Sequence, residues 1–158
     1  MKNSILLRFV FLLGFSIILN SVSAQNSSDK VKNEIAEALK LFNTAAQNAN
    51  TDQMMSLFDD SENIIFVGSD SAEIWKGKEQ IKGHLNSIFP NERVSLEMNR
   101  IDIDYNKNTA WVFVDGAIII SLGTGEKIKA PYRFTGIMVK KHNNWKWRLF
   151  NGSSPGGK

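Results

Sequence analysis

The sequence predicts an α+β fold in which a bent antiparallel sheet packs on three N-terminal helices and forms a cone. Apolar residues recur every three or four positions from Val31 to Ala46, which is typical of one face of a helix. After Pro90 the apolar residues alternate, as they do in strands. The alternation changes parity at Asn99-Arg100, which predicts a β-bulge that bends the strand. Wherever the core does not fill such a cone, a pocket remains.

The elements follow in order along the chain. A first helix presents the apolar positions Val31, Ile35, Leu39, Phe42 and Ala46. A second, short helix starts at Thr51 as N-cap, and a strand follows over 63–67. Pro90 ends a third helix over 78–89. The rest is a meander of four strands, over 94–105, 109–122, 126–141 and 145–153.

The first 24 residues have the pattern of a secretory signal peptide. Lys2 precedes an apolar run from Phe9 to Leu19, and small residues end at Ala24. We expect cleavage after Ala24 and a secreted or periplasmic protein with no membrane contact. An uncleaved anchor is the alternative, although the run is short for a membrane span. The predicted organisation is a signal peptide over 1–24, a flexible leader over 25–30, one domain over 31–153 and a disordered tail over 154–158.

Composition and charge exclude several functional classes. The 158 residues include no cysteine, which excludes disulfides and a cysteine nucleophile. The formal charge of +3 includes Lys2 and Arg8, and without them 17 basic residues face 16 acidic ones. That balance gives no reason to expect nucleic acid as a partner. The acidic residues over 59–73 do not match a calcium loop, so no metal or cofactor is expected.

A polar pair is predicted on two neighbouring strands. If the loop centred on Thr124 is a hairpin, Asp115 lies opposite Arg133. Trp111, Phe113, Thr135 and Ile137 share their side of the sheet, called here the Trp111 face. Arg133 could bind a carboxylate or carbonyl at the base of a pocket, or form only a structural cross-strand ion pair.

The last strand has two possible registers. A three-residue turn at His142-Asn143-Asn144 would place Asn151 beside Thr135 and Ser153 beside Arg133. A two-residue turn at Asn143-Asn144 would send both residues to the other face. We prefer the first register because it gathers the polar residues.

The opposite side of the sheet, called here the Val112 face, is also apolar. It carries Val112, Val114, Ile118, Ile120, Tyr132, Phe134 and Met138. Only one side of the sheet can meet the helices, and we expect that to be the Trp111 face. A large exposed apolar patch usually marks an interface, so homodimerisation through the Val112 face is predicted.

His84 and Trp75 are further candidates near the pocket. His84 has the helical spacing of Ile81, Leu85 and Ile88, and it could act as a general base. The alternative is a partly buried, hydrogen-bonded histidine without a chemical role. Trp75, between a turn and a helix start, is a candidate for the pocket wall.

Four stretches resemble the SnoaL-like branch of the nuclear transport factor two superfamily, also described as cystatin-like in fold. They are LFDDSENIIFVGSD, EIWKGKEQIKGHL, PYRFTGIMVKK and WKWRLFNGSSP, in the family's order over about 30–155. The chain also resembles the association domain of calcium/calmodulin-dependent kinase II. Leu149 and Asn151 stand where the family often has histidines, and Phe66 stands near the catalytic aspartate of steroid isomerase relatives.

Residues and resemblance together predict an exported domain that binds a small, largely apolar ligand. Its expected site residues are Trp75, Trp111, Phe113, Asp115, Tyr132, Arg133, Thr135, Leu149, Asn151 and Ser153. The resemblance implies an alternative, an isomerase, dehydratase, hydrolase or cyclase. His84 or Asp115 would then move the proton, and Tyr132 or Arg133 would stabilise the oxyanion. A third hypothesis is an assembly module without catalysis.

Overall fold

The computed structural model describes residues 28–156 of the chain. From Glu34 onward these residues belong to one compact unit, Glu34–Lys158. The predicted signal peptide and residues 25–27 of the predicted leader lie outside the described residues, as do residues 157–158. Residues 28–30, the end of that leader, are helical. Within 28–156, no helix has the length and apolar character needed to cross a membrane.

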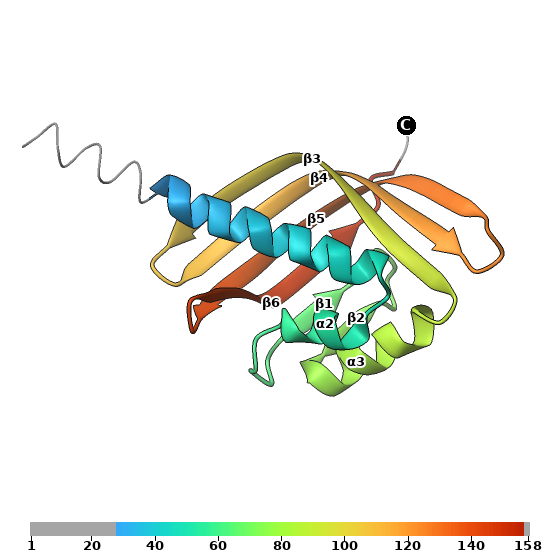
Figure 1. The fold of residues 1–158 in the computed structure, drawn as a ribbon, viewed down its shortest axis with the longest axis horizontal. Helices are drawn as coiled ribbons and strands as arrows, with labels where there is room; N and C mark the ends of the chain where they lie inside the picture. The colour runs from blue at the N-terminus through green and yellow to red at the C-terminus, as the bar shows by residue number, and fades with distance from the viewer. Residues whose placement is uncertain (1–27, 157–158) are drawn as a thin grey trace, which may run out of the picture. The chain divides into compact units, whose positions relative to one another are not determined.

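The unit Glu34–Lys158 is an α+β fold, as predicted (Figure 1). The N-terminal helix runs to residue 47. The further elements are α2 (Thr51–Ser56), β1 (Ile65–Val67), β2 (Ile74–Lys76), α3 (Gly77–Ile88), β3 (Glu92–Asn106), β4 (Thr109–Leu122), β5 (Lys127–Lys141) and β6 (Asn144–Ser153). The sheet order is β2-β1-β6-β5-β4-β3. It is mixed rather than wholly antiparallel, because β1 pairs parallel with β6.

Local chemistry sets the ends of the two short helices. Asn50, and not Thr51, caps α2, since its side chain accepts the backbone N–H of Gln53 at 2.9 Å. β2, which the sequence analysis did not predict, leads directly into α3. Gly77 begins α3 with a φ of +78°, a conformation that glycine adopts without strain.

The predicted bulge is confirmed in β3. The β3–β4 register shifts between Met98 and Arg100, so that Asn99 is the extra residue. Gly116 lies opposite, and a Cβ there would approach the backbone oxygen of Glu97 to 1.8 Å. Only glycine fits this close approach, and β3 bends along the sheet edge (Figure 1).

The preferred register of the last strand is confirmed, although the turn differs from the predicted one. Arg133 pairs with Ser153 and Thr135 pairs with Asn151. The turn itself has two residues, His142 and Asn143, both with positive φ. The β5–β6 register then shifts between Ile137 and Met138. From the Ile137–Leu149 pair to the Arg133–Ser153 pair, the strands follow the predicted register.

The assignment of the two sheet faces was wrong, because the structure places the Val112 face against the helices. Its buried members include Val112, Val114, Tyr132, Phe134 and Met138. They join Phe42 of the N-terminal helix and Phe150 of β6, whose rings stack at 5.3 Å. Trp111 and Ile137 are 47% and 37% exposed. The physical reason is that the Trp111 face carries Asp115 and Arg133, whereas the Val112 face buries almost only apolar atoms.

Candidate functional site

A cavity of about 260 Å³ lies between the helices and the Val112 face. Its walls come from the N-terminal helix, α2, α3, the segment 68–73 and strands β1 to β6. The lining is mostly apolar and aromatic, with a few polar groups, as in many small-molecule sites. The lining residues are Phe42, Ala46, Met54, Phe66, Gly68, Ser69, Glu73, Trp75, His84, Leu85, Ile88, Phe89, Glu92, Val94, Leu96, Ile118, Ile120, Tyr132 and Phe150.

His84 reaches this cavity from α3. Ile81 and Leu85 anchor the helix in the core, and their spacing turns the imidazole of His84 toward β2. There the imidazole stacks on the indole of Trp75, with centroids 3.5 Å apart and planes 17° apart. Burial lowers the pKa of His84 below 6.5, and the nearby Glu73 carboxylate opposes this only in part. The imidazole is therefore uncharged at neutral pH.

Tyr132 enters the cavity from β5 and is only 8% exposed. Its ring packs over Gly152 of β6, where a Cβ would lie 1.8 Å from the phenol oxygen. Burial raises the pKa of Tyr132 to about 12, with a contribution from Glu73. The hydroxyl thus keeps its proton at physiological pH and can donate or accept a hydrogen bond.

Glu73 supplies a fixed carboxylate at the same end of the cavity. Its Oε2 accepts the backbone N–H groups of Ser69 at 2.7 Å and Asp70 at 3.0 Å. Gly68 allows this arrangement, since a Cβ there would lie 2.0 Å from that oxygen. No cationic side chain forms a salt bridge with Glu73 in the described part of the chain.

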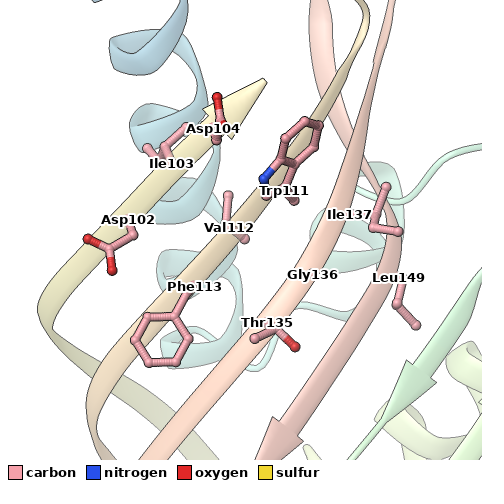
Figure 2. Close-up of a pocket in the computed structure, with 10 residues that line it drawn as sticks. All are labelled: Asp102, Ile103, Asp104, Trp111, Val112, Phe113, Thr135, Gly136, Ile137 and Leu149. Carbon is pink, nitrogen blue, oxygen red and sulfur yellow. The ribbon is translucent and has the colours of Figure 1, made fainter. Parts of the chain in front are cut away.

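A second hollow, of about 410 Å³, lies on the Trp111 face and has the sheet as its wall (Figure 2). Four of the predicted ligand residues, Trp111, Phe113, Thr135 and Leu149, line it together with Asp102, Ile103, Asp104, Val112, Gly136 and Ile137. Figure 2 shows the rings of Trp111 and Phe113 on the same side of the strands. The hollow therefore lies on the opposite side of the sheet from the cavity under the helices.

The predicted polar anchors Asp115 and Arg133 line neither space. Arg133 Nε donates to Asp115 Oδ1 at 2.5 Å, and both side chains are about half exposed. This is the cross-strand ion pair that the sequence analysis gave as its structural alternative. Asn151 and Ser153 follow on the same face by register, and Ser153 Oγ donates to the backbone oxygen of Arg133 at 3.4 Å.

The structure thus separates the predicted site residues into two groups. Trp75, His84 and Tyr132 come together under the helices, whereas the others lie on the Trp111 face. Sequence reasoning missed Glu73 and Phe150 as cavity residues. Parity with Tyr132 could have found Ile118 and Ile120, and the preferred register of β6, which pairs Phe150 with Gly136, already places Phe150 on the same face.

Comparison with known proteins gives a consistent family. The SnoaL-like domain model matches residues 35–155. Among curated proteins no match is found. A nuclear transport factor 2-like superfamily protein from Salmonella enterica is 18% identical with a TM-score of 0.73, over 83% of this chain and 95% of that one.

Two other solved structures share the fold. A candidate dehydratase of the NTF2-like family from Streptomyces avermitilis is 14% identical, with a TM-score of 0.73, over 82% of this chain and 99% of that one. A candidate calcium/calmodulin-dependent protein kinase II association domain from Xanthomonas campestris is 16% identical, with a TM-score of 0.70, over 79% and 88%. At these identities the likeness concerns the fold alone.

Proposed function

The chain belongs to the SnoaL-like family, and from this premise we propose that it binds a small, largely apolar ligand in the cavity under the helices. The observation that carries the proposal is the grouping of three polar side chains in a largely apolar cavity, where Glu73 interacts with both His84 and Tyr132. Tyr132, His84 and Glu73 face it there, while Phe66 and Phe150 stack at 4.8 Å along its wall. Such a division orients a ligand that has an apolar body and one polar group.

The ligand's polar group is better matched to these three residues than to Arg133. A carboxylate or a carbonyl would suit the ligand if Arg133 lay in the pocket. With Arg133 paired to Asp115 on the Trp111 face, the cavity under the helices has no cationic residue in its described lining to hold a carboxylate. A carbonyl oxygen could still accept the hydroxyl proton of Tyr132.

The binding proposal is tested by calorimetric titration with naphthalenemethanol, whose fused rings suit an aromatic cavity and whose hydroxyl suits its polar end. We expect saturable binding of one molecule per chain, with a dissociation constant of about 1–100 μM. The complex should also raise the melting temperature, because the ligand binds the folded chain. Absence of any saturable heat, and an unchanged melting temperature, would contradict the proposal.

A catalytic use of the same cavity is the second candidate function. The observation in its favour is that a neutral imidazole and a protonated phenol line one cavity, as a base and an oxyanion donor must. Asp115 lies outside that cavity, which leaves His84 as the proton acceptor. The lowered pKa of His84 keeps the base form present below pH 6.5, so a reaction that uses it should keep its rate to lower pH than a free imidazole allows.

We also propose that the domain forms a homodimer, now through the Trp111 face. The helices within residues 28–156 leave this sheet face uncovered, and Trp111 and Ile137 are exposed on it and line the hollow of Figure 2. A second copy would remove this apolar surface from water. The assembly hypothesis needs the same interface.

The dimer is tested by light scattering and native mass spectrometry. Trp111→Glu should convert a dimer to a monomer at micromolar concentration, because it introduces a charge into the apolar contact. Leu41→Glu is the matched control, since Leu41 is 49% exposed but lies on the N-terminal helix, on the other side of the sheet. A wild-type protein that is already monomeric would contradict the proposal.

Export remains a proposal as well, supported by the signal-peptide pattern over 1–24. The native mass spectrum of protein purified from its own source also tests it. Chains that begin at Gln25 are the expected result, and chains that keep residues 1–24 would contradict it.

A further inference from the structure

The charges that line the cavity under the helices are all of one sign. Glu73 and Glu92 are its acidic members, and none of the described lining residues is lysine or arginine. His84 does not balance them, since burial leaves its imidazole neutral. An anionic ligand would therefore enter against two carboxylates with no counter-charge to receive it.

The carboxylate of Glu73 is held in place and is only partly used by the protein. Oε2 takes the N–H groups of Ser69 and Asp70, and the backbone oxygen of Glu73 takes the N–H of Gly68 at 2.8 Å. Oε1 accepts no hydrogen bond from the described residues. The Glu73 carboxylate is held in place before any ligand arrives, so binding a ligand costs no further side-chain entropy at this residue.

Tyr132 gives a second, independent indication of a ligand. Its side chain is more than nine-tenths buried and lines the cavity, yet its hydroxyl has no hydrogen-bond partner within residues 28–156. The hydroxyl oxygen is open to the cavity and is not one of the buried unpaired atoms, so a bound molecule can reach it and supply the partner. The phenol oxygen and the neutral imidazole of His84 both offer lone pairs beside the carboxylate of Glu73.

The aromatic walls favour a positive charge at the same place. Trp75 and Tyr132 both line the cavity, with one face of the Trp75 ring covered by His84. The faces of such rings attract ammonium groups. An ammonium has only donors to offer, and this end of the cavity offers three acceptors. A carboxylate ligand has only acceptors and would find mainly repulsion.

We infer that the cavity selects an apolar amine in its protonated form, with the ammonium against Glu73 and Tyr132 and the apolar body along Phe66 and Phe150. This inference rests on the proposed function and names the ligand class of that site. Glu73 is its specificity-determining residue.

The experiment compares three probes of one shape: naphthylmethylamine, naphthalenemethanol and naphthoate. Calorimetric titrations at neutral pH and low salt should show the amine binding at least about tenfold more tightly than the alcohol, and naphthoate not binding. Glu73→Gln should remove the advantage of the amine while the alcohol keeps its affinity. The glutamine oxygen can still accept the N–H groups of Ser69 and Asp70, so the segment 68–73 should keep its conformation.

Glu62→Gln is the matched control, because Glu62 is exposed and does not line the cavity. It should leave the preference for the amine unchanged. If the alcohol binds as tightly as the amine, or if Glu73→Gln keeps the preference, the inference is overturned while the binding proposal stands. If none of the three probes binds, both fall together.

Discussion

Replacing Arg148 with methionine is expected to lower the free energy of unfolding by about 3–5 kcal/mol. Asp59, which is 4% exposed, accepts a hydrogen bond from Nη2 of Arg148. Methionine keeps most of the side-chain bulk but leaves the carboxylate of Asp59 buried without its cation. Such an uncompensated charge costs far more than the pair itself contributes.

The pair lies where the chain after α2 joins the sheet. The backbone N–H of Asp59 donates to the oxygen of Trp147 at 2.9 Å, and the N–H of Trp147 donates to Leu57 at 2.8 Å. Loss of the cation therefore strains the contact that holds α2 to β6. Urea unfolding followed by tryptophan fluorescence gives the change in free energy.

A matched comparison separates burial from charge. Arg133→Met also breaks an arginine–aspartate pair, but one that is about half exposed, and it should cost less than about 1 kcal/mol. The double variant Asp59→Asn with Arg148→Met should recover much of the loss, because neither charge then remains. Equal losses for Arg148→Met and Arg133→Met would contradict the buried-charge explanation.

Strand pairing could be predicted from the sequence because local features determine it. The loop at Thr124 determines the pair of Asp115 with Arg133, and the parity change at Asn99 marks the bulge. The register of β6 was also predicted correctly, although the two-residue turn and the shift after Ile137 compensate for each other. Neither of these two features has a clear sequence signal.

Which face of β4 and β5 the helices cover depends on how much polar surface each face would lose. The alternation of residues along the strands does not reveal this difference. Both faces of β4 and β5 carry large apolar residues, so alternation alone ranks them equally. The helices cover the face that loses the least polar surface, and Asp115 with Arg133 excludes the other. A polar anchor at the base of a pocket would require the opposite arrangement, with Trp111 and Phe113 under the helices, and the structure contradicts it.

Of the residues around the polar groups of the cavity, His84 and Trp75 could be predicted from local patterns, whereas Glu73 could not. Helical spacing brought His84 to the cavity, and the turn before α3 brought Trp75. Glu73 was interpreted within an acidic run, since the hydrogen bonds of its carboxylate to Ser69 and Asp70 form only when the segment 68–73 folds over Gly68. Such a tertiary arrangement has no periodic pattern to reveal it.

Replacing Ile118 with tryptophan is expected to raise the dissociation constant of naphthalenemethanol by at least about 100-fold. Ile118 lines the cavity from β4, on the side opposite the helices. An indole there would occupy much of a space of about 260 Å³. Calorimetric titration measures the loss, and the melting temperature reports whether the domain stays folded.

The neighbouring residue provides the control. Ile119 alternates to the other side of β4 and does not line the cavity, so Ile119→Trp should bind naphthalenemethanol as the wild type does. Both variants add the same side chain to the same strand, and only one of them fills the cavity. If Ile118→Trp keeps the wild-type affinity, the probe binds elsewhere, and the cavity under the helices is not its site. Loss of binding in Ile118→Trp alone would assign the ligand to the layer between helices and sheet, where Tyr132 and His84 face it.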